Sequence, residues 1–229
     1  MSRPGRDHDW IGVGHVPRGR WLSIGANASG GLALDWFARE VSGRDGRPDV
    51  AEVLRLAADA PTGRLVFLPY LQGERTPVWD PLARGLFLGL VAGTTRGEMA
   101  RAVLEGAAFS VRHMIESLEK TTGRRVASLP SVGGGTRSAL GNRIRADVLQ
   151  RPLEVLRCHE TAALGAALMA GVGAGVYASE AAAVAAAVGT CAADRVEPDP
   201  SRAGVYDRLY RVYREAYART RGLMHDLAS

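Results

Sequence analysis

Hydrophobic residues recur along this chain at two spacings, one typical of helices and one typical of strands. The clearest helix follows Thr95-Arg96-Gly97-Glu98, which has the form of a capping box, a hydroxyl and a carboxylate that satisfy each other's backbone amides. Beyond this box, apolar residues recur at intervals of three and four from Ala100 to Leu118. The cap explains Gly93-Thr94-Thr95 by itself, so no phosphate is needed to account for these residues.

Shorter patterns predict the remaining elements. Apolar runs bounded by glycine and proline predict strands at 10–16, 21–24, 63–69, 86–90, 126–132 and 152–156, with a hairpin turn at Pro17-Arg18-Gly19. Helices are predicted at 32–40, 50–58, 138–149, 161–170, 180–188 and 203–221. Alternating strands and helices indicate an α/β domain.

The last predicted helix carries four tyrosines at helical spacing, Tyr206, Tyr210, Tyr213 and Tyr217. Rings tipped with hydroxyls suit a half-buried face, so this stripe predicts core packing rather than a binding surface.

Composition excludes several classes of protein. The 229 residues suffice for one large domain or two small ones, and 46% of them are hydrophobic. The longest apolar stretch, 181–188, is too short to span a bilayer, and the polar start lacks a secretory signal. With Cys158 and Cys191 as the two cysteines and no metal-ligand spacing, we expect a cytoplasmic protein without a structural disulfide or metal site.

The net charge of +5 does not indicate a nucleic-acid partner, because arginines are interleaved with acidic residues along the whole chain. Lys120 is the single lysine, and it sits before Gly123, where a basic residue typically ends a helix. A P-loop, which ends in Gly-Lys-Ser/Thr, is therefore absent. Bound phosphates would be held by backbone amides, hydroxyls or arginines.

The glycine run Gly133-Gly134-Gly135 lies between a predicted strand and a predicted helix. Such a turn leaves free amides and a helix dipole facing an anion, and without β-carbons it can lie flat against a purine or ribose. Three glycines at this place are also typical of a plain tight turn, and the run is not the spaced fingerprint of a dinucleotide-binding fold.

Several motifs in order resemble the FGGY carbohydrate kinases, and their xylulokinase-like members in particular. One is Val132-Gly133-Gly134-Gly135-Thr136-Arg137-Ser138 with the helix and the Glu160-Thr161-Ala162-Ala163-Leu164-Gly165 segment that follow it. Another is the loop 70–81, which contains Gly73-Glu74-Arg75-Thr76-Pro77, and a third is 84–90 with Glu98 to Gly106. The resemblance runs from about Trp21 to the C-terminus.

This resemblance implies an actin-like, ribonuclease H-like ATPase fold, with residues 21–229 as the C-terminal nucleotide-binding lobe of a normally two-lobed sugar kinase. Residues 1–20 would form a short N-terminal segment and a first strand. Carried over by position, Gly134 and Gly135 next to Gly133 would lie against the adenosine, and Ser138 would cap the helix beside it. ATP and Mg²⁺ are the implied cofactors.

Two parts of the implied site depart from the pattern or stay open. Where relatives often have Gln, this chain has Arg143 beside Asn142, so the adenine contacts on that helix differ. Gly25 and the Ser29-Gly30-Gly31 turn are candidates for a phosphate-side contact. Their alternative role is a helix start that needs small residues.

Four charged residues are interpreted as structural rather than catalytic. Asp80 before a proline is an ordinary turn initiator, and Glu74 with Arg75 is interpreted as a loop ion pair. In the resembled family this loop is structural. Asp147, within the helix after the glycines, is interpreted as a structural hydrogen-bonding residue.

Phosphoryl transfer needs a carboxylate to take the proton of the attacking hydroxyl. In the resembled family this aspartate and a Gly-Thr phosphate loop belong to the first lobe, and nothing in 1–20 resembles either. We therefore expect no catalytic residue in this chain and no activity from it alone. Its partners would be ATP or ADP and a separately encoded first lobe, with D-xylulose or a related ketose or polyol as substrate of the complete enzyme. The alternative is a non-catalytic nucleotide-binding or protein-interaction module.

Overall fold

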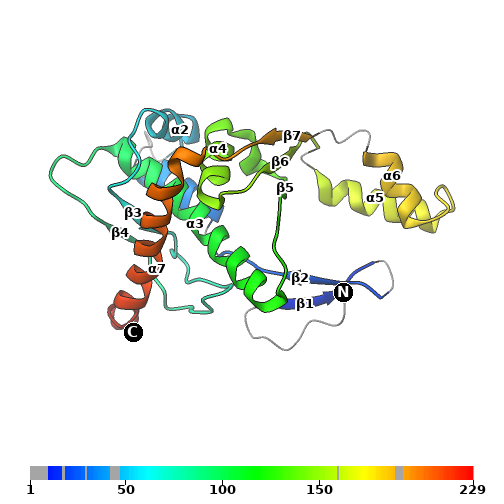
Figure 1. Cartoon of the computed structure of the whole chain (residues 1–229), viewed down its shortest axis with the longest axis horizontal. Helices are drawn as coiled ribbons and strands as arrows, with labels where there is room; N and C mark the ends of the chain where they lie inside the picture. The colour runs from blue at the N-terminus through cyan, green and yellow to red at the C-terminus, as the bar shows by residue number, and fades with distance from the viewer. Residues whose placement is uncertain are drawn as a thin grey trace.

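The structure is a computed structural model that describes residues 10–16, 19–28, 30–41, 47–158, 160–188 and 193–228. The long helix α3 (Arg96–Thr122) runs through the middle of the molecule, and α1, α2, α4, α7 and β3 pack around it (Figure 1). The Thr95 hydroxyl accepts from the amide of Glu98, and the Glu98 carboxylate accepts from the amide of Thr95 at 2.9 Å. The capping box predicted from the sequence is confirmed.

The first third of the chain forms a hairpin and two helices. The antiparallel strands are β1 (Ile11–Gly14) and β2 (Trp21–Ile24), and the helices are α1 (Gly30–Glu40) and α2 (Val50–Ala58). Of the predicted turn, Pro17 and Arg18 lie outside the described residues. Asp49 caps α2 by accepting from the amide of Glu52 at 2.9 Å, so the helix begins where the sequence predicted.

A second antiparallel pair, β3 (Val66–Leu68) and β4 (Leu86–Leu88), lies against the N-terminal half of α3. The two strands are joined by the loop that carries the Gly73-Glu74-Arg75-Thr76-Pro77 motif. Phe67 and Phe87 face each other across the pair with ring centroids 4.4 Å apart, and β3 is buried on all three residues.

The third sheet contains β5 (Leu129–Ser131), β6 (Leu153–Leu156) and β7 (Ala193–Val196). β5 pairs parallel to β6 and β7 pairs antiparallel to it. The connection from β5 to β6 consists of the short 3₁₀ helix η1 (Gly134–Arg137) and helix α4 (Ala139–Leu149). Helices α5 (Thr161–Gly173) and α6 (Glu180–Val188) project from the body as an arm (Figure 1).

The chain ends with η2 (Pro200–Arg202) and helix α7 (Ala203–Asp226). Tyr206, Tyr210 and Tyr213 are buried between α7, α3 and β3, and the Tyr213 hydroxyl lies 2.8 Å from that of Tyr70. The tyrosine stripe therefore packs into the core, as the sequence predicted.

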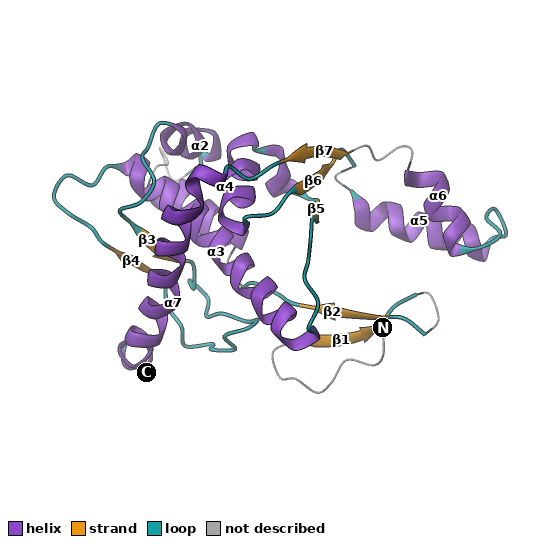
Figure 2. Cartoon of the chain, in the orientation of Figure 1, coloured by secondary structure: helices purple, strands orange, loops and turns teal. Residues whose placement is uncertain are grey.

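The predicted α/β class is confirmed, with helices dominant and the strands short (Figure 2). The predicted helix 138–149 is confirmed as α4, which Ser138 caps, and η1 holds Gly134 and Gly135 just before it. The predicted strand 126–132 is shorter than expected, since the part that pairs with β6 is β5, Leu129–Ser131. Among the described residues, no helix combines the length and apolar character needed to cross a membrane.

Candidate functional site

A cavity of about 580 Å³ lies between two walls of different character. One wall is apolar and comes from α1, α2 and α3, with Leu34, Leu54 and Val103 among its residues. The opposite wall is the glycine turn with the start of α4. This volume lies within the roughly 300–1,000 Å³ range of ligand pockets, and the apolar lining with few polar groups is typical of them.

The glycine wall is built by local hydrogen bonds. Gly133 has a φ of 88°, a left-handed conformation that favours glycine, and its carbonyl accepts from the Thr136 amide and the Thr136 hydroxyl. Ser138 caps α4 by accepting from the Gly141 amide at 3.0 Å. The shape of the turn is therefore fixed by hydrogen bonds within the turn itself.

Four of the eight residues predicted to bind nucleotide line this cavity: Gly30, Gly134, Gly135 and Ser138. A β-carbon added at Gly134 would meet no atom within 4 Å, so this residue faces open space. The cavity thus joins the glycine turn to the start of α1, two segments that the sequence analysis identified separately. Ser29 lies outside the described residues.

The other four predicted residues do not line the cavity. Asn142 is buried and donates to the Thr136 carbonyl at 2.8 Å, and Arg143 reaches the Glu197 carbonyl at 3.4 Å. At Gly25, a β-carbon would lie 2.6 Å from the ring of Trp10, so a larger residue there would have to displace that ring. Gly133 precedes η1 and shapes the turn without lining the cavity. Their roles in binding stay predictions.

Arg145 was not predicted as a site residue, and its side chain lines the cavity. Its Nη2 donates to the Gly135 carbonyl at 2.6 Å and to the Asn142 side-chain oxygen at 2.5 Å, and its Nε donates to the Gly141 carbonyl at 3.2 Å. Helical spacing was the available signal, because positions 138, 141 and 145 share one face of α4 and position 143 does not.

Glu74 connects the β3–β4 loop to the segment before α1. Its carboxylate accepts from the amides of Ala28 and Arg75 at 2.9 and 2.8 Å, and Ser110 of α3 donates to it at 3.4 Å. Burial raises the pKa of Glu74, and these hydrogen bonds counter the rise only in part. The predicted Glu74–Arg75 ion pair was wrong, since Glu74 binds the backbone amide of Arg75.

Asp80, in the same loop, binds the C-terminal helix. Tyr217 donates to its carboxylate at 2.6 Å, and the Nε2 of His225 lies 2.7 Å from the same oxygen. Its other oxygen accepts from the Leu82 amide at 3.0 Å, which is the turn-initiating contact that the sequence predicted. Asp147 is also structural as predicted, since it accepts from the Asp199 amide at 2.8 Å.

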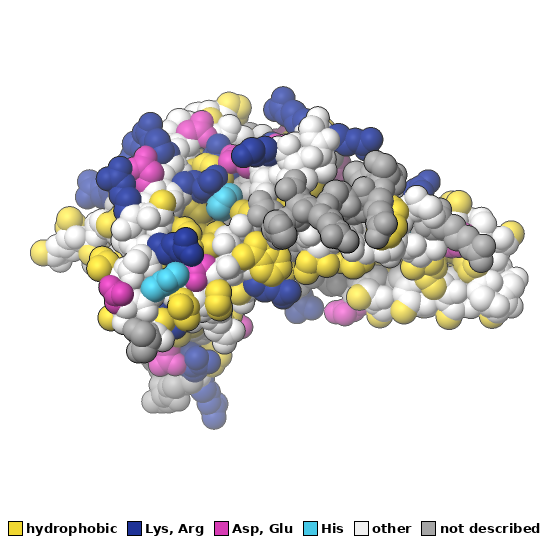
Figure 3. Space-filling model, turned by 90° about the horizontal axis from the view of Figure 1, so that it is seen from below, with side chains coloured by type: hydrophobic (Ala, Val, Ile, Leu, Met, Phe, Trp, Pro, Cys, Tyr) yellow, Lys and Arg dark blue, Asp and Glu magenta, His cyan; other side chains and the backbone are white. Residues whose placement is uncertain are grey.

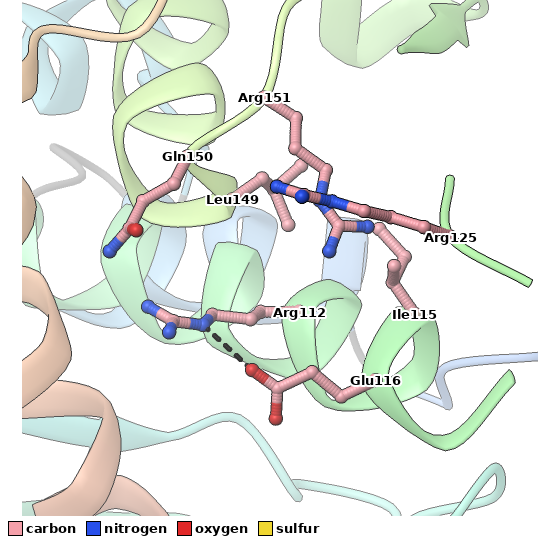
Figure 4. A pocket seen from close by; sticks show the side chains of 7 residues that line it. All are labelled: Arg112, Ile115, Glu116, Arg125, Leu149, Gln150 and Arg151. Atoms are coloured by element: carbon pink, nitrogen blue, oxygen red, sulfur yellow. Dashed lines mark hydrogen bonds and ion pairs between the residues drawn. The ribbon is translucent and has the colours of Figure 1, made fainter. Parts of the chain in front are cut away.

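Two further cavities differ from the glycine cavity in the residues that line them. The first, of about 570 Å³, lies beside the β3–β4 loop, is lined by Glu74 and Trp79, and shares Asn27 with the glycine cavity. The second, of about 110 Å³, is lined by Arg112, Arg125 and Arg151 (Figure 4). Arg112 pairs with Glu116 at 3.0 Å and Arg151 pairs with Glu119 at 2.9 Å, so most of its positive charge is compensated. Its volume is too small for a nucleotide.

The described residues of the glycine cavity suit a nucleotide better than a bare metal ion. None of those that line it is an Asp or Glu, so they offer Mg²⁺ no carboxylate ligand. Across the described part of the chain, no group of three or more His, Cys, Asp and Glu is placed to hold a metal.

Comparison with known proteins gives a consistent result. Residues 9–174 match the model of the C-terminal domain of the FGGY family of carbohydrate kinases. A xylulose kinase of Staphylococcus epidermidis is 31% identical over 210 residues, which cover 90% of this chain and 41% of that protein. A glycerol kinase of Thermus brockianus is 41% identical over 137 residues, 60% of this chain and 27% of that protein.

Solved structures agree on the fold. The xylulose kinase from Rhodospirillum rubrum superposes with a TM-score of 0.82 at 34% identity, over 96% of this chain and 44% of that one. The glycerol kinase of Plasmodium falciparum with ADP superposes with a TM-score of 0.70 at 23% identity, which shows the fold alone. The chain spans about two fifths of the length of the xylulose kinases that it matches.

Proposed function

The chain belongs to the FGGY family of carbohydrate kinases, and we propose that it supplies the ATP-binding lobe for phosphoryl transfer from ATP to a sugar hydroxyl. The observation that carries this proposal is the glycine turn at Gly134 and Gly135, which faces an apolar wall across a cavity of about 580 Å³. The actin-like fold of the family, shared with the solved sugar kinases, supports it.

Each wall of the cavity has a physical role in this proposal. The apolar wall of α1, α2 and α3 removes one face of the purine from water, and the glycine wall approaches the adenosine closely because it has no β-carbons. Ser138 fixes the start of α4 beside it, and Gly30 at the start of α1 is a candidate phosphate-side contact. Mg²⁺, bound to the phosphates, would neutralise part of their charge.

The complete reaction needs more groups than this cavity offers. A carboxylate must take the proton of the sugar hydroxyl, and no carboxylate is among the described residues that line the cavity. We therefore propose that the catalytic base and the sugar pocket come from the other lobe, in the same polypeptide or in a separate chain. The named relatives favour D-xylulose or a related ketose or polyol as the acceptor.

The second candidate function is a non-catalytic nucleotide-binding or protein-interaction module. The arm favours it, because α5 has no buried residue, Ala183 is the buried residue of α6, and Val176 and Val184 are exposed. Hydrophobic side chains extend across the face seen from below and along this arm (Figure 3). Exposed apolar surface of this kind often marks a contact with a partner.

Calorimetric titration with ADP and with ATP in Mg²⁺ tests the nucleotide site. Gly134→Val should abolish binding without unfolding the chain, since Gly134 is outside the left-handed region and its new side chain would enter open space in the cavity. Gly93→Val is the matched control, because Gly93 is exposed in the loop after β4 with similar free space. Absence of binding by the folded wild type, or equal binding by Gly134→Val, would overturn the proposal.

A further inference from the structure

Arg145 differs from the other part-buried arginines in what accepts its hydrogen bonds. Arg101 binds Glu105 at 2.9 Å, and Arg112 and Arg151 bind Glu116 and Glu119. The three hydrogen bonds of Arg145 all go to neutral oxygens: the carbonyls of Gly135 and Gly141 and the side chain of Asn142. Burial lowers the pKa of Arg145, and no carboxylate counters this effect.

The free edge of this guanidinium faces the cavity. Nε and Nη2 are held by the three neutral oxygens, whereas Nη1 makes no hydrogen bond to any residue that the structure describes. A β-carbon built on Gly135 would lie 3.6 Å from Nη1, so this nitrogen lies next to the glycine wall. Both Nη1 hydrogens are therefore available to an acceptor beside Gly135.

The charge of the cavity lining points to the kind of acceptor. Arg137 and Arg145 both line the cavity, and none of the described lining residues is acidic. A partly desolvated cation without a counter-ion is costly, and a bound anion removes that cost. The apolar wall across the cavity suits a base, which leaves the phosphates as the anionic part of a nucleotide.

We propose that Arg145 is a phosphate-binding residue of this cavity: Nη1 donates to a phosphate oxygen of the bound nucleotide while Nη2 and Nε hold the glycine turn in place. This inference rests on the proposed nucleotide-binding function. Asn142 then acts indirectly, because it orients the guanidinium and donates to the Thr136 carbonyl of the same turn. In this proposal the Arg145 side chain links α4 to the ligand, and Asn142 holds that side chain in place.

The test compares ADP with adenosine, which lacks the phosphates, by calorimetric titration at low and at moderate salt. We expect Arg145→Leu to weaken ADP binding by about 10- to 100-fold, the range for a charge-assisted hydrogen bond, and to weaken adenosine binding much less, by the loss of its contacts to the glycine turn alone. The ADP affinity of the wild type should fall more steeply with salt than that of the variant. Arg145→Lys should retain part of the ADP affinity, and Arg211→Leu, at an exposed position of α7, should change nothing.

Retained adenosine binding by Arg145→Leu would show that its cavity is intact, so a loss of ADP affinity could not be assigned to misfolding. Equal losses for adenosine and ADP would mean that Arg145 supports the turn without contacting a phosphate, and would overturn the proposal. Unchanged ADP affinity, or an Arg145→Lys variant no better than Arg145→Leu, would overturn it as well. If the folded wild type bound neither ligand, the nucleotide function itself would fail, an outcome distinct from these.

Discussion

At the scale of single residues, Glu74 and Asp80 illustrate how hydrogen-bond donors determine whether the pKa of a buried carboxylate is raised or lowered. Both belong to the β3–β4 loop and both are 4% exposed. For Glu74, burial outweighs two amides and a hydroxyl, and its pKa is raised. For Asp80, burial also raises the pKa, but the donors Tyr217 and His225 outweigh it and bring the pKa down to about 2. Asp80 is therefore charged at all ordinary pH values and holds α7 in that state.

Asp80→Asn should destabilise the protein in a pH-dependent way. A carboxyl whose pKa falls from 3.8 to about 2 on folding stabilises the native state above pH 4, by about 2 kcal/mol on this shift. That contribution is lost as the pH falls through 2. Urea unfolding at pH 7, 4 and 2 should show the difference between wild type and variant shrinking toward zero in acid.

Asp35→Asn, at an exposed position of α1, is the control for Asp80→Asn and should show no such trend. A stability difference for Asp80→Asn that stayed constant from pH 5 to pH 2 would contradict the assignment. It would mean that the carboxylate form of Asp80 is not what Tyr217 and His225 stabilise.

Residue-level reasoning from the sequence located the turn and the helix cap where backbone chemistry is local, and the binding roles assigned there stay predictions. Gly134 and Gly135 belong to a glycine run that stands out in the sequence, Ser138 was carried over from the family resemblance, and all three line the cavity. Arg145 was missed because its position depends on a side chain that turns back along α4 to Gly135, ten residues earlier. A sequence motif shows which residues follow one another in the chain. It does not show where the terminal group of a long side chain lies in the folded protein.

At the scale of elements, α3 is central because small residues allow its neighbours to approach closely. A β-carbon at Gly97 would lie 2.7 Å from the Leu56 carbonyl of α2, and one at Gly106 would collide with the Phe67 carbonyl of β3. The sequence predicted α3 correctly from its cap and its apolar stripe. It did not reveal that glycines inside this helix mark where α2 and β3 cross it.

Gly106→Ala should destabilise the protein although alanine favours helices. The new methyl group must displace β3 from α3, and overpacking of this kind costs about 1–3 kcal/mol. Gly222→Ala in α7 is the matched control, because nothing lies within 4 Å of its β-carbon. That variant should gain about 0.5–1 kcal/mol from helix propensity. Thermal unfolding should lower the Tm of the first variant and raise that of the second, and a raised Tm for Gly106→Ala would contradict the close approach.

A strand was missed where buried and exposed residues do not alternate along the chain. β7 was not predicted, because its residues Ala193 to Arg195 are exposed and only Val196 is half-buried, so hydrophobic and polar positions do not alternate along it. Its place in the sheet comes from antiparallel pairing with β6, and Arg157 and Asp194 form an exposed ion pair at 2.7 Å. Pairing of this kind depends on the tertiary arrangement, which hydrophobic periodicity does not contain.

At the scale of the whole molecule, the predicted order of elements was largely right but their assembly was not accessible from the sequence. The described strands form three small sheets, each packed on α3 or α4 or set apart as the β1–β2 hairpin (Figure 1). Three buried clusters form the core, and α3 contributes to all of them. Periodicity predicts which face of an element is buried, and it does not say which element covers that face.

A nucleotide-binding lobe without a catalytic base should depend on the other lobe for turnover. If the glycine cavity holds ATP but contributes no carboxylate, this chain should bind ATP and show no sugar-dependent ADP formation with D-xylulose or glycerol. Addition of the separately produced N-terminal half of a xylulose kinase should restore turnover, because that half of a relative would supply the base and the sugar pocket. A coupled ADP-release assay measures both conditions, and Gly134→Val in the same mixture should not restore turnover, since its side chain would stand where the adenosine is proposed to lie. If this chain alone gave turnover and Gly134→Val abolished it, the base would have to lie within this chain. That result would contradict the proposal that the other lobe supplies the base. Restored turnover that Gly134→Val leaves unchanged would instead show that nucleotide binds elsewhere, and the glycine cavity would lose its proposed role.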